Sequence, residues 1–198
     1  MKMEEVGKMA AELEKFYAQG GTTGVADYLK SIGFEPGRFY QELEMTSRYV
    51  DTHQDYSMSN SQVSLHSHTF YEILCVQNTC DVEYLVGAER YRLQKGDIVI
   101  IPPGVSHRPL LPEHMTEPYT RDVLWFSQEF VEVCRRLFSD RFDSSQRRSS
   151  LLRTAGTKWE YLQEFFHTGV LESERREAGW ETLVVGNTVQ LLVHIGRA

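Results

Sequence analysis

The chain has 198 residues, a formal net charge of −7 at pH 7 and a hydrophobic content of 41%. This length fits one domain with an appendage or two small domains, and the hydrophobic content excludes a disordered chain. The acidic balance argues against DNA binding by these residues, because a DNA-binding surface is normally basic. No run of some 18 apolar residues is present, so no membrane span is predicted.

The first residues, MKMEEVGKMAAELEKF, are acidic and amphipathic, and they lack the apolar stretch of a signal peptide. We therefore expect a cytoplasmic protein. The cysteines Cys75, Cys80 and Cys134 form no C-x-x-C pair. In a reducing cytoplasm the expected state is free thiols that are mostly buried.

The N-terminal part of the chain is predicted to be helical. Apolar residues at helical spacing predict a helix over residues 3–19, and a shorter helix ending at Gly33 is expected to follow. Residues 26–34 have a faint helix-turn-helix pattern, but few basic residues surround them, so we favour packing over DNA reading. Residues 1–38 are thus an N-terminal helical segment whose role the sequence does not indicate.

Beyond residue 38 the pattern changes to short runs of β-branched and aromatic residues broken by turn formers. The predicted strands are residues 40–50, 63–67, 69–77, 81–86, 89–94, 98–101 and 121–127. Gly87 is expected at the first central position of a type II′ turn. The fully apolar run 98–101 predicts a strand buried on both faces. Residues 109–120 contain three prolines and are expected to form a loop.

The last third of the chain is predicted to be helical. Ser127 is the expected cap of one helix, residues 140–150 read as an exposed linker, and further helices are predicted over 157–174 and 180–196. The last of these is apolar over more than one stripe, which requires a second partner. It is either sandwiched within the monomer or part of a subunit interface. We favour a homodimer formed through residues 157–196.

Three histidines and a glutamate form the most informative pattern of the chain. His66, His68 and Glu72 are separated by even steps, so in an unbulged strand their side chains would point to the same face. His107, on another strand after a Pro-Pro-Gly turn, could complete a set of three nitrogens and one oxygen. Such a set suits a single divalent ion of Zn, Fe, Ni or Mn. The alternative is a polar cluster that holds no metal.

This spacing resembles the cupin double motif, HxHx3E followed by Gx5PxGx2H, with the second part matched by Gly96, Pro102, Gly104 and His107. Three positions depart from the motif, since Asn60 and Thr79 replace glycines and Leu111 replaces a frequent asparagine. The resemblance implies a mainly β fold with flanking helices. The expected fold is a cupin-like double-stranded β-barrel, or jelly roll, over residues 39–127, with N-terminal helices and a C-terminal helix pair within residues 128–198.

The order of elements resembles the regulatory half of AraC/XylS-type transcriptional regulators. The resemblance is carried by residues 65–73, 84–93, 95–107 and 121–127, and it covers about residues 40–198. It implies a cupin domain that senses a small-molecule effector, a helix pair that forms the dimer, and a separate C-terminal domain that reads DNA. We expect that DNA-binding domain to lie beyond residue 198.

Effector contacts are expected from side chains that could point into the barrel near the histidines. The candidates are Phe70, Tyr84, Arg108 and Trp125. Aromatic rings and a guanidinium suit a sugar or a small carboxylate, although Phe70 and Trp125 also fit a purely packing role.

Two other classes of function use the same fold. One is a metal-dependent cupin enzyme, either a dioxygenase or a sugar isomerase, and the other is an oligomeric binding module without DNA function. We favour the regulator and expect no enzymatic activity. His53, His114, His167 and His194 have no partner pattern and are predicted to be ordinary surface or packing residues.

Overall fold

The computed structural model describes residues 45–60, 63–78, 81–138 and 150–198. The predicted helices within residues 1–38 lie outside the described residues, as does all but the last residue of the predicted linker 140–150. The strands in the described part are β1 (Val50–Ser57), β2 (Tyr71–Val76), β3 (Glu83–Val86), β4 (Glu89–Arg92), β5 (Ile98–Ile101), β6 (His107–Leu110), β7 (Tyr119–Phe126) and β8 (Leu151–Leu152). The helices are α3 (Gln128–Phe138), α4 (Leu162–Arg175) and α5 (Trp180–Arg197).

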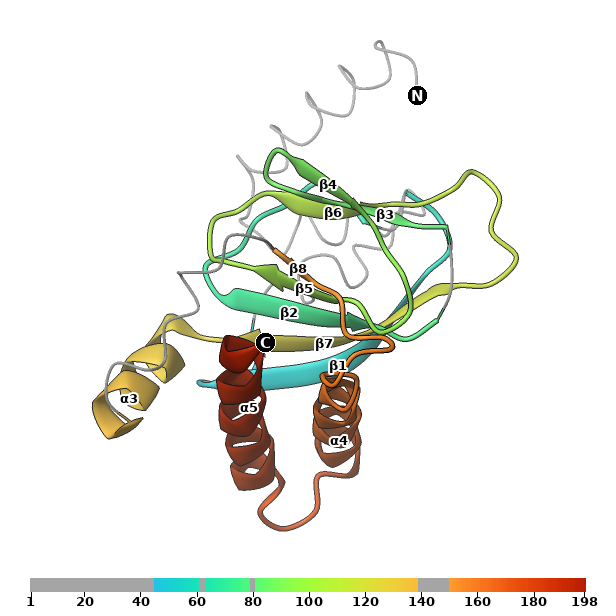
Figure 1. Cartoon of the computed structure of the whole chain (residues 1–198). Helices are drawn as coiled ribbons and strands as arrows, with labels where there is room; N and C mark the ends of the chain where they lie inside the picture. The colour runs from blue at the N-terminus through green and yellow to red at the C-terminus, as the bar shows by residue number, and fades with distance from the viewer. Residues whose placement is uncertain (1–44, 61–62, 79–80, 139–149) are drawn as a thin grey trace, which may run out of the picture. The chain divides into compact units, whose positions relative to one another are not determined.

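The strands form two antiparallel sheets that face each other (Figure 1). The larger sheet has the order β1-β7-β2-β5-β8, and the smaller one has the order β4-β3-β6. Strands β3 and β4 form a hairpin across Gly87, which adopts the positive φ of +59° that the predicted turn requires. This is the predicted mainly β architecture with flanking helices, and the fold is of the cupin type.

The larger sheet separates two hydrophobic cores. Along β2, Leu74 and Val76 point between the sheets, whereas Ile73 and Cys75 point toward the helices. The apolar strand β5 alternates in the same way and is buried throughout, as its sequence predicts. Cys75 and Cys134 are free and buried, as expected, and Cys80 lies outside the described residues.

The helices cover the outer face of the larger sheet. Helix α3 begins after Ser127, whose Oγ accepts a hydrogen bond from the Phe130 amide at 3.1 Å, so the predicted cap is confirmed. Helices α4 and α5 lie side by side below β1 and β7 (Figure 1). On α5, Leu183 remains 54% exposed and Val193 36% exposed. In the described part of the chain, no helix has both the length and the apolar character needed to cross a membrane.

Three strand predictions differ from the structure. Residues 63–67 form no regular strand, and only His66 is paired there, in an isolated bridge with His107. Residues 45–49 are not in a strand, because the Asp51 carboxylate accepts hydrogen bonds from the Thr46 and Ser47 amides and forms a turn there. The strand instead runs over Val50–Ser57, where polar residues on both faces hide the expected alternation. Strand β6 was missed because it contains Pro109, which an edge strand can accommodate.

Candidate metal centre

The two halves of the histidine pattern are joined by main-chain hydrogen bonds. His66 and His107 form an isolated antiparallel bridge, with N–H to O=C distances of 3.3 and 2.9 Å. The Gly104 amide donates to the His68 carbonyl oxygen at 2.8 Å, and Gly104 has a φ of +76°, which favours glycine at this turn. The turn before β6 is therefore hydrogen-bonded directly to the segment that contains His66 and His68.

These bonds bring the four predicted ligands together. One ligand atom from each of His66, His68, Glu72 and His107 lies within 4.8 Å of the others. His68, Glu72 and His107 are buried, and His66 is half-buried. The predicted reason for this convergence was nevertheless wrong. Residues 66–72 are not one strand, since the chain bends at residues 69–70 before β2 begins.

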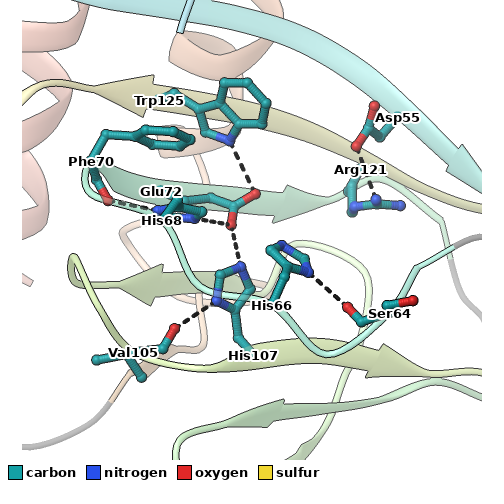
Figure 2. A network of polar contacts seen from close by, with 10 residues as sticks. All are labelled: Asp55, Ser64, His66, His68, Phe70, Glu72, Val105, His107, Arg121 and Trp125. Carbon is teal, nitrogen blue, oxygen red and sulfur yellow. Dashed lines mark hydrogen bonds and ion pairs between the residues drawn. The ribbon is translucent and has the colours of Figure 1, made fainter. Parts of the chain in front are cut away.

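All three imidazoles direct Nδ1 at a main-chain carbonyl oxygen. The acceptors are Ser64 for His66 at 2.7 Å, Phe70 for His68 at 2.8 Å, and Val105 for His107 at 2.9 Å (Figure 2). A carbonyl oxygen can only accept, so each Nδ1 carries the proton. In the neutral ring, each Nε2 is then left with a free lone pair, which is the usual arrangement of metal-binding histidines.

The Nε2 atoms of His68 and His107 face the same oxygen of Glu72. Oε2 of Glu72 lies 3.2 Å from His68 Nε2 and 2.8 Å from His107 Nε2 (Figure 2). The buried Nε2 of His107 has no well-aligned hydrogen bond to any described residue despite this short distance. Lone pairs and a carboxylate that face one another repel unless a proton or a metal ion lies between them. The donor set therefore fits a divalent cation.

The pKa shifts of Glu72 and His66 also favour a cation site. Burial opposes ionisation of Glu72, but the imidazoles of His107 and His68 outweigh it, and the pKa of Glu72 lies well below its ordinary value. Burial lowers the pKa of His66, which keeps that ring neutral and able to bind a metal. Burial also disfavours a charged His107, yet the Glu72 carboxylate outweighs burial and raises the pKa of His107. Without a metal, a proton on His107 would be the counter-charge of Glu72.

Three of the four predicted effector residues surround this cluster. Phe70 stacks on the His68 ring with centroids 3.9 Å apart, and Trp125 donates its indole N–H to Glu72 Oε1 at 3.2 Å. The ring centroid of Tyr84 lies 6.4 Å from that of His107. All three are buried, and burial raises the pKa of Tyr84 well above its ordinary value. Their contacts are therefore with the histidines and Glu72.

Arg108 is not brought to the cluster. It follows His107 on β6, so its side chain leaves the opposite face of the strand. Its Nη2 donates to Asn60 Oδ1 at 3.1 Å. The Asn60 amide also bonds both main-chain groups of Leu111, at 2.7 and 2.9 Å. Asn60 and Leu111, two departures from the cupin motif, are thus direct partners.

A second polar group inside the barrel was not predicted. Arg121 on β7 is buried, and its guanidinium donates to Asp55 Oδ2 at 2.9 Å and to Ser57 Oγ at 3.0 Å. It also lies over the Tyr119 ring. Arg121 is four residues before Trp125, an even step that puts both side chains on the inner face of β7. This alternation is the sequence signal that could have indicated that Arg121 points inward.

Comparisons with known proteins find likeness among solved structures. The sequence matches no protein-family profile. It also matches no curated protein. Similar solved structures include a cupin 2 conserved barrel domain protein from Salinispora arenicola, with 20% identity and a TM-score of 0.34 over 47% of this chain and 75% of the other. A cupin protein from Bacteroides fragilis shows 17% identity and a TM-score of 0.35 over 46% of this chain and 74% of the other.

A third similar structure is an RmlC-like cupin family protein with a double-stranded β-helix fold from Methanocaldococcus jannaschii. It shows 11% identity and a TM-score of 0.35 over 45% of this chain and 79% of the other. Such values describe a likeness of fold alone. The chain's own sheets and the spacing of His66, His68, Glu72 and His107 indicate a cupin-type fold with a candidate metal centre.

Proposed function

We propose that this chain is the effector-sensing and dimerisation part of an AraC-like transcription regulator, with a single divalent metal ion as part of its effector site. The main support for the metal site is that all three imidazoles donate a hydrogen bond from Nδ1 to a main-chain oxygen. Their Nε2 atoms are thereby left for a cation beside Glu72.

The ion would be held by His66, His68, His107 and Glu72 Oε2. Three nitrogens and one oxygen suit Zn, Fe, Ni or Mn. When bound, such an ion offers its remaining coordination positions to oxygen atoms of an effector, for which a sugar or a small carboxylate is the proposed class. The protein's own contribution is to hold the ligand atoms in place and to keep the cluster largely shielded from water.

The helices support the regulatory part of the proposal. Residues 182–193 of α5 carry no charged side chain, and Leu183 and Val193 are exposed on this helix. A second copy of the chain would bury these groups in a homodimer formed through residues 157–196. DNA would be bound by a separate C-terminal domain, in keeping with the net charge of −7 of these residues and a cytoplasmic protein.

Strand β7 provides a physical route between the candidate site and the helices. Trp125 on its inner face contacts Glu72, whereas Leu124 and Phe126 on its outer face belong to the core shared with α3, α4 and α5. An effector that binds one arrangement of β7 better than another would shift the position of the helices. Such differential binding is how an effector could alter the placement of a DNA-binding domain.

Metal analysis tests the first part of this proposal. Protein purified without a histidine tag should contain about one equivalent of a divalent metal by plasma mass spectrometry, and His68→Ala should contain far less. His114→Ala removes an exposed histidine of the loop before β7 and should keep its metal. A wild-type protein that binds no metal after incubation with Zn, Fe, Ni or Mn would refute the metal site.

The regulatory part has its own test. The coding region downstream of Ala198 should continue into a domain of about 100 residues with two helix-turn-helix units. A stop codon directly after Ala198 would contradict the proposal. Metal-loaded protein should also fail to turn over keto acids, sugars or catechols, and turnover of any of these would instead support a cupin enzyme.

A further inference from the structure

We infer that Trp125 is a positioning residue that restricts Glu72 to one metal-binding oxygen and keeps a coordination position free for the effector. This inference rests on the metal site proposed above and concerns how the carboxylate is presented to the ion.

The two carboxylate oxygens of Glu72 are used differently. Oε1 accepts a hydrogen bond from the indole N–H of Trp125 at 3.2 Å. Oε2 faces the Nε2 atoms of His68 and His107 (Figure 2). The indole nitrogen can only donate, so this contact holds Oε1 as an acceptor whether or not an ion is present.

The indole is fixed in this orientation by its surroundings. Trp125 and Glu72 are directly opposite each other on the paired strands β7 and β2. The indole ring is packed edge-on against His53, with centroids 4.7 Å apart, and at a tilt against Phe70, with centroids 4.8 Å apart. Phe70 is itself stacked on His68. Rotation of the indole would disturb both neighbouring rings, and one of them supports a metal ligand.

The consequence concerns coordination number. A carboxylate can bind a metal through one oxygen or through both. With Oε1 held by Trp125, Glu72 occupies one position, and the three histidines and Glu72 together fill four. If the N–H were lost, Oε1 could turn toward the ion and take a fifth position. The indole N–H therefore keeps that position available for an oxygen atom of the effector.

The substitution Trp125→Phe tests this inference, because it removes the N–H and keeps an aromatic ring. Loss of such a supporting hydrogen bond should weaken Zn²⁺ binding by roughly tenfold to a hundredfold, measured by competition with a chromophoric chelator. The control is Trp159→Phe, which changes a tryptophan of the turn before α4. Its Zn²⁺ affinity should equal that of the wild type.

Co²⁺ provides a readout that a merely structural role of Trp125 would not change. Visible absorption of Co²⁺ weakens as its coordination number increases. Trp125→Phe loaded with Co²⁺ should therefore absorb less per bound ion than the wild type and should bind azide, a small anionic probe, at least tenfold more weakly. An unchanged Co²⁺ spectrum, Zn²⁺ affinity and azide affinity would overturn the inference and leave the metal site intact.

A measurement on the wild type keeps the inference testable if Trp125→Phe does not fold. The chain contains three tryptophans, so their indole N–H signals can be assigned by NMR with Trp159→Phe and Trp180→Phe. The Trp125 signal should exchange slowly with solvent and should shift when Zn²⁺ is added. A Trp125 signal that does not respond to bound Zn²⁺ would overturn the inference, and a wild type that binds no metal would overturn it together with the proposed site.

Discussion

The main chains of His66 and His107 are hydrogen-bonded to each other in an antiparallel bridge outside the regular strands. Their imidazole rings lie next to each other, with ring centroids 4.3 Å apart. The contact joins the segment before β2 to the first residue of β6, which lies in the other sheet. The candidate metal centre is thus placed where the two sheets meet.

Zn²⁺ should stabilise the folded protein if it binds this centre. At a free concentration 100 times Kd, binding to the folded state alone contributes about 2.7 kcal/mol. For a chain of this size, that stabilisation corresponds to an increase in Tm of roughly 5–10 °C. Thermal unfolding with Zn²⁺ and with a chelator measures the effect.

His107→Ala should lose this Zn²⁺-induced increase in Tm, whatever its own stability, because it removes a buried ligand. His114→Ala should keep it. An equal increase in Tm for His107→Ala and the wild type would show that Zn²⁺ binds elsewhere.

Removing the partner of the buried Arg121 should destabilise the protein. Asp55→Ala leaves a buried guanidinium without the carboxylate at 2.9 Å and should reduce the free energy of unfolding by about 3 kcal/mol. The double variant Asp55→Ala with Arg121→Met should recover part of this loss, because no unpaired charge remains. Urea unfolding of the three proteins measures both effects, and a double variant less stable than Asp55→Ala would contradict the prediction.

Asp122 predicts a pH dependence of stability. It is buried on the helix side of β7, where its two oxygens accept hydrogen bonds from Gln54 and Gln77 at 2.7 and 2.8 Å. Burial raises the pKa of Asp122. The folded state therefore holds this proton more tightly than the unfolded chain. The contribution of Asp122 to stability becomes less favourable as pH rises from about 3.9, the ordinary value, through the folded pKa.

Asp122→Asn removes this titration. The free energy of unfolding of Asp122→Asn relative to that of the wild type should therefore increase between pH 4 and pH 7, measured from urea unfolding curves at each pH. The exposed Glu113→Gln is the control for loss of one negative charge. A difference between Asp122→Asn and the wild type that decreases over this range would show that the sign of the pKa shift is wrong.

The proposed dimer predicts the effect of a charge on α5. Leu183→Glu places a carboxylate on the exposed apolar part of this helix and should convert the dimer to a monomer at about 10 μM protein, measured by light scattering after size exclusion. Leu137→Glu is a matched control, because Leu137 is 69% exposed on α3, outside residues 157–196. A wild type that is monomeric at tens of micromolar would contradict the dimer, since about 1 μM corresponds to a contact of ~8 kcal/mol.

Several parts of the fold could be predicted because local sequence determines them. The apolar run of β5 and the cap at Ser127 are examples in which neighbouring residues are sufficient. Strand β1 could not be predicted in the same way. Its residues His53, Asp55 and Ser57 are polar, and they face the barrel because Arg121 and Trp125 on β7 provide partners for them.

The directions of the Arg108 and Arg121 side chains are a second example, within the site, of what local sequence does not determine. Arg121 lies in the predicted strand 121–127, whereas Arg108 lies in none of the predicted strands. The positions of His107 and Trp125 within β6 and β7 decide which arginine points inward. A shift of one residue in a strand reverses every side chain. Sequence periodicity did not reveal β6, so the direction of Arg108 could not be predicted.

By itself, the sequence determined the types of the candidate ligands, their spacing and the mainly β class of the fold. Only the tertiary structure decided which atoms of those ligands are left free for a cation, and that Trp125 holds one oxygen of Glu72. The reason is that ring orientation and hydrogen-bond partners depend on carbonyl groups and strands brought together from distant parts of the chain, which local periodicity does not encode.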